Sequence, residues 1–460
     1  MNSSRTIEGS WSILGNEEPC FGVLEYLPDS GAILTVNLPF TGDFSQRAKR
    51  LFEKDDPVPK IIHGLDANGH PITLFGCTAP SKKHSGALVR IQVHPLYTFL
   101  GKHLDSWDHL AFQEAFVEYS APSSWLCRTG IKTEFAPNWD SNTSYQRPPD
   151  IKCRLNGGVK LAISVRPTCK GEYNSYQISE RQVAEFEFPS PEHFERINRN
   201  WIHVFRRFLG LMTGIEVFLD KASFRLPESE PQDEIEVLRT NEHVDTANRS
   251  LLAGNSLVEF AQIRDSLEAV LQRWFSYHEH LDAVLDLYFA TIFNRGFHGN
   301  HFFLFMAQAL EVYHAHNPRF NGCEEPKAAF KTRRNRILGA VTLRADKDWL
   351  KEKLHFANSK TLARRIKDIL DLHPDDIANL IPHPEAFAAK IRHTRNYLTH
   401  YDKKLRESGK IAEGLELHRM CYQMKALLEI CMLKDIGIDG SPIERVINRV
   451  NAMRFYGVDD

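Results

Sequence analysis

The spacing of apolar residues changes once along this chain, and that change constrains its fold more than any other feature. In the first half, short apolar runs are separated by Gly, Pro, Asn and Asp, which is typical of strands joined by turns. In the second half, apolar residues recur every three or four positions, which is typical of amphipathic helices. The sequence therefore predicts an α+β multidomain protein, with a β-rich N-terminal domain over residues 1–250 followed by an all-α helical bundle over residues 251–460.

Apolar runs bounded by turn residues predict the strands of the first domain. The expected strands are Phe21–Leu27, Ala32–Leu38, Ile61–Leu65, Ile72–Phe75, Leu88–Val93, Leu161–Val165, Val183–Phe188, Ile215–Leu219 and Ile235–Leu238. Asn68-Gly69 indicates a hairpin turn, because both residues tolerate positive φ. One helix is expected within this half, with Ser190 as its N-cap and Pro191 as its first residue.

The second half is expected to be a series of helices joined by short connections. Residues at helical spacing place them over Leu267–Ile292, Phe302–His314, Trp349–Leu370 (whole or broken), a segment outlined by Phe387, Ile391 and Leu398, and Leu417–Cys431. Helices of this length with short connections are typical of a bundle.

The formal net charge of the whole chain is −2, so any nucleic-acid partner has to be met by local basic patches. Eight cysteines are scattered without a Cys-x-x-Cys pair, which is typical of reduced thiols in a cytosol. The first ten residues do not resemble a signal peptide, and no apolar run approaches the ~20 residues of a membrane span. We therefore expect a cytoplasmic protein without a membrane partner.

Metal and cofactor sites are not expected. Histidines two positions apart, such as His278 with His280, point to different faces of a helix and make poor chelates. The sequence contains neither a Gly-rich phosphate loop nor a Gly-x-Ser-x-Gly elbow. Kinases, nucleotide-driven motors and triad hydrolases are therefore unsupported.

Residues 395–400, with the sequence Arg-Asn-Tyr-Leu-Thr-His, combine groups that can cut RNA without a metal. An imidazole can move the proton of a 2′-hydroxyl, and a guanidinium can hold the charge that builds on the phosphate. Arg395, Asn396 and His400 are therefore the candidate catalytic residues.

The spacing of Arg395 and His400 means little by itself, since chance gives about one or two such pairs in a chain of this composition. A second match, Arg273…His278, lies within the expected long helix, and we interpret it as a solvated Arg and His on an amphipathic helix. Asn396 and a cationic neighbourhood distinguish the first match. The neighbouring cations are Arg392, Lys403 and Lys404.

Five residues of helix turn two side chains about 140° apart, so Arg395 and His400 do not share a face. Two arrangements can bring these groups together. The helix can end near Thr399 and let His400 swing back, or two copies of the motif can face each other across a two-fold seam. The second arrangement predicts a homodimer.

Three stretches carry a resemblance to a known family: Phe303–His314, Arg392–His400, and the segment from Gly64 through Gly69 to Leu74. The second half resembles the HEPN family of nucleotide-binding and ribonuclease bundles, whose signature is Arg, a polar residue, three more residues and His. The whole chain resembles its ApeA-type branch, the abortive-infection proteins of anti-phage defence.

The resemblance implies a metal-independent endoribonuclease that cuts host RNA, often tRNA. His400 would be the general acid and base, Arg395 the phosphate clamp and Asn396 an orienting residue. Glu311 would be a supporting acid or, alternatively, an ordinary residue of a helix surface. The resemblance also implies a homodimer formed through the bundle, and an N-terminal domain that restrains it until a phage-derived trigger appears.

Five cations within ten residues form a second basic cluster. They are Lys327, Lys331, Arg333, Arg334 and Arg336. Such a cluster can contact an RNA backbone, or it can be a solvated helix start or loop. We take Lys331, Arg333 and Arg334 as candidate RNA-binding residues, together with Arg392, Lys403 and Lys404.

Two other functions stay open. The bundle could be a non-catalytic RNA- or nucleotide-binding module, in which Arg395 and His400 contact a ligand or pack the helix. Alternatively, the chain could be the toxin of a toxin–antitoxin pair.

Overall fold

The structure is a computed structural model that describes residues 4–13, 19–39, 60–85, 88–120, 125–135, 140–173, 175–230, 232–239, 256–293 and 299–452. The chain forms two compact units, residues 1–213 with 217–268, and residues 214–216 with 269–460. The expected boundary at residues 250/251 lies within 240–255, outside the described residues.

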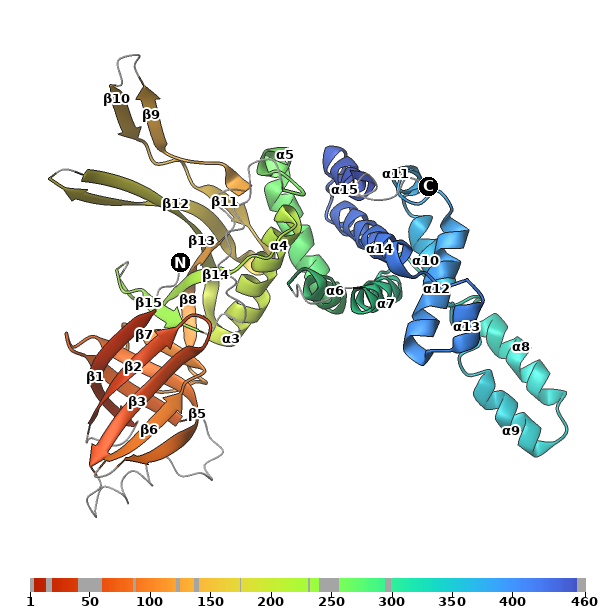
Figure 1. The fold of residues 1–460 in the computed structure, drawn as a ribbon, viewed down its shortest axis with the longest axis horizontal. Coiled ribbons are helices and arrows are strands. Elements are labelled where there is room, and N and C mark those ends of the chain that lie inside the picture. Colours follow the sequence, from red (N-terminus) through yellow and green to blue (C-terminus); the bar gives the residue numbers. More distant parts are fainter. Residues whose placement is uncertain are drawn as a thin grey trace. The chain divides into compact units, whose positions relative to one another are not determined.

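The first unit is built on a sheet whose described strands pair antiparallel with their neighbours. In spatial order the strands are β11 (Ile151–Arg154), β12 (Lys160–Glu172), β13 (Ser175–His193), β8 (Ala111–Tyr119), β14 (Leu219–Arg225), β15 (Ile235–Leu238), β7 (Tyr97–Leu100), β5 (Pro71–Ser85), β4 (Lys60–Asp66), β1 (Arg5–Ile13), β2 (Cys20–Leu27), β3 (Gly31–Pro39) and β6 (Leu88–His94). β6 also pairs with β5, which closes the strands from β5 to β6 into a ring (Figure 1). A separate pair is formed by β9 (Ile131–Phe135) and β10 (Ser141–Tyr145).

Apolar and polar residues alternate along the strands of the ring, so the apolar side chains point inward and form one core. Trp11, Leu24 and Tyr26 belong to this core and are almost fully buried. A side chain at Gly64 would place its Cβ 2.4 Å from the Trp11 ring, so only glycine fits there. The predicted Asn68-Gly69 turn is confirmed: it joins β4 to β5, and Gly69 has a φ of +81°.

The helix predicted to begin at Ser190 begins later. β13 continues through His193, and the helical segment comprises α3 (Phe194–Arg196), a π-helical turn (Ile197–Ile202) and α4 (His203–Thr213). The pairing of β13 with β8 is irregular between Glu187 and Glu192, and Pro191 lies in that irregularity. Proline has no N–H for the ladder, so a bulge accommodates it as readily as a helix start does.

A second prediction in this region is also wrong. The strand expected over Ile215–Leu219 begins only at Leu219 and continues as β14 to Arg225. The strand expected over Ile235–Leu238 is confirmed as β15.

The second unit is helical. After α5 (Phe260–Ile263) in the first unit, the described helices are α6 (Leu267–Phe293), α7 (Asn300–His316), α8 (Lys327–Gly339), α9 (Arg344–Lys353), α10 (Leu362–Leu370), α11 (Pro374–Ala378), α12 (Pro384–His400), α13 (Lys403–Glu407), α14 (Gly414–Asp435) and α15 (Ser441–Ala452). α14 packs against α7 and α15, and its residues from Leu427 to Leu433 are all buried. A helix that is buried on every side forms the centre of a bundle. The predicted fold class, a β-rich domain followed by an all-α bundle, is confirmed. None of the described helices has the length and apolar character needed to cross a membrane.

Candidate active site

Helix α12 carries the Arg-Asn-x-x-x-His motif. Pro384 begins it, which suits a first helical position that needs no N–H donor. Its buried side, which includes Ile391 and Leu398, packs against α10 and α7. Thr394, fully buried, accepts a hydrogen bond from the N–H of Ala412 at 2.9 Å. These contacts fix the helix rotation, and therefore the direction in which the motif side chains leave it.

The motif is helical over its whole length. Tyr401 has a φ of +52° and ends α12, and its N–H donates to the carbonyl of Tyr397 at 2.6 Å. His400 is thus the last residue of a regular helix, and it does not swing back toward Arg395. The two side chains leave the helix about 140° apart. The other arrangement, a site completed by a second copy of the chain, stays a prediction.

The motif side chains have no partners among the residues that the structure describes. Within the described ranges, those of Arg395, Asn396 and His400 make no hydrogen bond or ion pair, and neither Arg395 nor His400 contacts the other. Arg395 and Asn396 are half-buried, whereas His400 is exposed. Buried polar groups usually find a partner within the protein, whereas these three side chains are half-buried or exposed. This set therefore remains available to a ligand or to another chain.

Positive charge surrounds the motif. Lys403 and Lys404 are exposed on α13, and their ammonium groups have no ion-pair partner in the part of the chain that the structure describes. The carboxylate of Asp402 accepts the backbone N–H of Lys404 at 2.9 Å and caps α13, and it forms no ion pair with either lysine among the described residues. Arg392, one turn before the motif, donates to Nε2 of His393 at 2.7 Å.

His393 is a neighbour that sequence reasoning did not select. Burial lowers the pKa of its imidazole, and the charges of Arg392 and Lys410 lower it further. His393 is therefore neutral near pH 7 and can accept the Arg392 hydrogen bond. In the sequence, only its position directly after Arg392 could have indicated that His393 belongs to this neighbourhood.

Glu311 is half-buried on α7, which packs against α12. No hydrogen bond or ion pair joins Glu311 to Arg395, Asn396 or His400 among the described residues. The structure thus places the candidate supporting acid on a neighbouring helix and not in contact with the motif.

The other candidate RNA-binding residues lie apart from α12, on helix α8. Arg333 pairs with Glu325 at 2.7 Å, and Arg334 donates to the carbonyl of Lys351 at 3.4 Å. Lys331 is exposed and has no partner among the described residues. Two of these three cations are therefore already engaged in holding the local structure.

The second Arg-x-x-x-x-His match is structural. Arg273 donates to the carbonyl of Ile436 at the end of α14, at 3.5 Å, and His278 pairs with Asp282 at 3.3 Å. His278 is buried, so the expectation of a solvated histidine was wrong for this position. The two matches differ in that only the motif on α12 leaves its groups without internal partners.

A buried polar cluster joins α7 to α10, and both of these helices pack against α12. His314 contacts Asp368 at 2.8 Å, and the same carboxylate accepts from Lys360 at 2.5 Å. Burial lowers the pKa of His314, although Asp368 acts in the opposite direction. Burial likewise lowers the pKa of His373.

We expect the protein to lose stability as the pH falls below about 6.5, the usual pKa of an unfolded histidine. His314, His373 and His393 all have lowered pKa values in the folded chain. The unfolded chain then binds more protons than the folded chain, so stability is full above that pH and declines below it. Melting temperatures at pH 8 and pH 5.5 measure the effect.

His314→Gln should reduce the difference between the two melting temperatures, whereas the same change at the exposed His316 should not. An equal melting temperature at both pH values in the unaltered chain would contradict this prediction.

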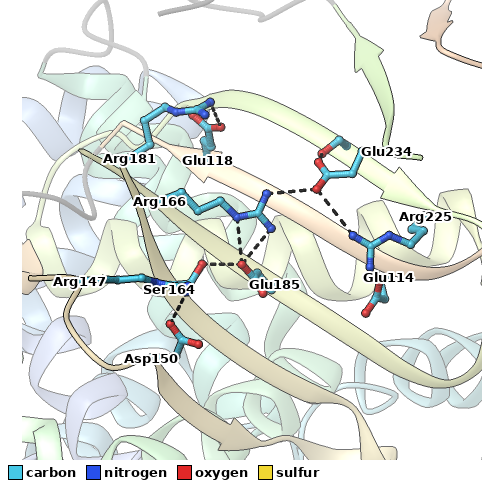
Figure 2. Close-up of polar contacts among 11 residues, drawn as sticks. Glu114, Glu118, Arg147, Asp150, Ser164, Arg166, Arg181, Glu185, Arg225 and Glu234 are labelled. Atoms are coloured by element: carbon cyan, nitrogen blue, oxygen red, sulfur yellow. Dashed lines mark hydrogen bonds and ion pairs between the residues drawn. The ribbon is translucent and has the colours of Figure 1, made fainter. Parts of the chain in front are cut away.

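The first unit contains a separate network of charged residues, on strands β8, β12, β13 and β14 and at Glu234, just before β15 (Figure 2). Arg166 contacts Glu185 at 3.0 Å and Glu234 at 3.1 Å, and Arg225 pairs with Glu114. A cavity of about 520 Å³ lies beside it and is lined by residues of both charges. Because these charges neutralise each other, this surface lacks the excess positive charge that RNA binding requires. In the described residues, no three His, Cys, Asp or Glu side chains are grouped to hold a metal ion.

The fold and the motif define a class: a strand-rich unit followed by a helical bundle of HEPN type, with its signature on one helix. The model of ApeA N-terminal domain 1 matches residues 6–274, more than half of the chain. The model of the Apea-like HEPN domain matches residues 304–441, which include the whole motif. The chain therefore belongs to the ApeA family, with a C-terminal HEPN domain. No curated protein and no solved structure matches it.

Proposed function

We propose that this protein is an anti-phage effector whose HEPN domain is a metal-independent endoribonuclease that cuts host RNA, tRNA in particular. HEPN domains are generally ribonucleases, and the ApeA family is associated with anti-phage defence. The observation that carries the proposal is the Arg395-Asn396…His400 set. Its side chains make no hydrogen bond or ion pair within the described chain, and unpaired cations lie beside it.

The proposed reaction needs only these groups. His400 removes the proton of a 2′-hydroxyl, and the resulting oxygen attacks the adjacent phosphorus. Arg395 stabilises the charge that develops on the phosphate, and Asn396 orients it. The imidazolium of His400 then gives this proton to the 5′-oxygen, which leaves. The products are a 2′,3′-cyclic phosphate and a 5′-hydroxyl.

The proposed site is shared by two chains. Because Arg395 and His400 leave α12 in different directions, one chain would supply the arginine and its partner the histidine. The half-burial of Arg395 and Asn396 without internal partners is consistent with such a shared site.

Restraint is part of the proposal, because an unregulated ribonuclease would kill its own host. The strand-rich first unit would hold the HEPN domain inactive in the cytoplasm until a phage-derived component binds. Arg392, Lys403 and Lys404 would contact the RNA backbone next to the cut.

Purified protein is to be incubated with total tRNA in EDTA, with and without extract from phage-infected cells. We expect cleavage that the His400→Ala variant does not produce. Binding without cleavage under both conditions would instead support a non-catalytic RNA-binding module. Death of uninfected cells on expression of the chain alone would favour the toxin of a toxin–antitoxin pair.

A further inference from the structure

We infer that the hairpin of helices α8 and α9 is an RNA-binding arm that recognises unpaired bases. This inference rests on the proposed nuclease function and adds a substrate class to it, namely single-stranded or looped RNA. The arm comprises residues 327–353 together with Phe356, which follows it.

The hairpin stands apart from the bundle. In Figure 1, α8 and α9 lie side by side and extend away from α10, α12 and α13. The two helices pack on each other, and neither packs as extensively on any other described element. Leu338 is the one residue of α8 that is buried, and α9 buries none. Such short helices gain little stability from propensity alone, so a surface this open suits a binding partner.

Hydrogen bonds hold the base of the hairpin together. Asn358 is buried and exchanges hydrogen bonds with the backbone of Glu325, at 3.0 Å in each direction. Lys360, two residues after Asn358, donates a hydrogen bond to the carboxylate of Asp368 on α10 at 2.5 Å. The base of the hairpin is thereby attached to α10, which packs against the helix that carries the motif.

The charge of the arm fits a polyanion. Residues 327–353 contain nine basic and three acidic residues, a net charge of +6 in a chain whose total is −2. The exposed cations whose side chains have no partner among the described residues are Lys327, Lys331, Arg336, Lys347, Lys351 and Lys353. An RNA backbone neutralises such a cluster and releases the counter-ions that surround it.

Exposed aromatic rings distinguish this arm from a simple basic patch. Trp349 is 60% exposed and Phe356 is 74% exposed. Large apolar side chains at this exposure are costly in water, and unpaired bases stack on them irrespective of sequence. Cations next to exposed rings favour RNA over a protein partner, because a protein docking surface is usually depleted of lysine.

The test measures binding separately from cleavage. Full-length His400→Ala protein is titrated into a labelled RNA stem-loop, and into the blunt duplex of the same stem, in EDTA. Trp349→Ala with Phe356→Ala should weaken stem-loop binding about tenfold or more and leave duplex binding unchanged. Phe135→Ala is the control, since this ring is 79% exposed but lies in the first unit.

A second variant tests the charge. Lys331→Gln with Arg336→Gln should weaken binding to both RNAs and lower the salt dependence of the affinity. Unchanged stem-loop affinity in the aromatic variant would overturn the inference, and a change in its oligomeric mass would then identify a protein-docking surface.

The same substitutions in the chain with His400 intact separate this inference from the proposed function. If RNA is cut equally with or without the aromatic residues, the proposed nuclease function is supported and the proposed role of the arm is refuted. If no RNA is cut but the aromatic variant still binds the stem-loop more weakly, the role of the arm is supported and the proposed nuclease function is refuted.

Discussion

Replacing His400 with Ala is expected to abolish RNA cleavage while the chain remains folded. A positioned acid or base contributes about 10²–10⁴-fold in rate, so the residual activity should fall below about 1%. The side chain is exposed and makes no hydrogen bond or ion pair in the described structure. Its loss should change the free energy of unfolding by no more than about 0.5 kcal/mol, as is usual for an exposed side chain without partners.

His316→Ala is the matched control, because His316 is also an exposed histidine at the last position of a helix, α7. Cleavage rates and melting temperatures of the two variants are to be compared with the unaltered chain. A folded His400→Ala protein that cuts RNA at the original rate would refute the assignment of His400.

Mixing two inactive variants is expected to restore activity. In a shared site, Arg395→Ala chains supply an intact His400 and His400→Ala chains supply an intact Arg395. Each mixed dimer then contains one complete site. Random assortment makes half of the dimers mixed, so the mixture should recover about a quarter of the original rate. Each variant alone should stay near the background rate.

The two variants carry different tags, are unfolded and refolded together, and co-purification shows that mixed dimers have formed. Arg395→Ala with Arg395→Lys is the control mixture, since neither chain of that pair supplies an intact arginine. Mixed dimers that are as inactive as either parent would place the whole site in one chain.

Most of the strands and helices that the spacing of apolar residues predicted are present, and so is the motif helix, but others, such as β1 and β8, were not predicted. The failures have local causes. Ser190 and Pro191 satisfy the requirements of a helix start, but Pro191 occupies an irregularity in β13 instead. The segment Trp349–Leu370 is broken, and Asn358 lies in the break because it bonds to Glu325, which no local pattern reveals.

For the candidate site, too, the sequence predicts some features and only the structure reveals others. Sequence identifies the residue types at positions 395, 396 and 400, but it cannot show whether these groups are already used. Arg334 is engaged by a backbone carbonyl far along the chain, that of Lys351. By contrast, the α12 motif has no such internal contacts among the described residues. Only the folded structure distinguishes a cation that is already bound within the protein, such as Arg334, from the groups of the α12 motif.

Likewise, α8 is not among the helices that apolar spacing predicted, and its basic residues left a helix start and a loop as open alternatives. Its apolar residues do not form a stripe, because the hairpin buries almost nothing. Amphipathic patterns reveal the helices that pack on a core, so an arm that projects from the core leaves no such pattern.

The central claim is that Arg395, Asn396 and His400 cut RNA without a metal, and the ends of the RNA products test it most directly. Total tRNA is incubated in EDTA, with extract from phage-infected cells, and with either the unaltered protein or His400→Ala. We predict new fragments that carry a 2′,3′-cyclic phosphate and a 5′-hydroxyl, and that appear only with the unaltered protein. Fragments with a 3′-hydroxyl and a 5′-phosphate, fragments made equally by His400→Ala, or intact tRNA in both reactions would contradict the claim.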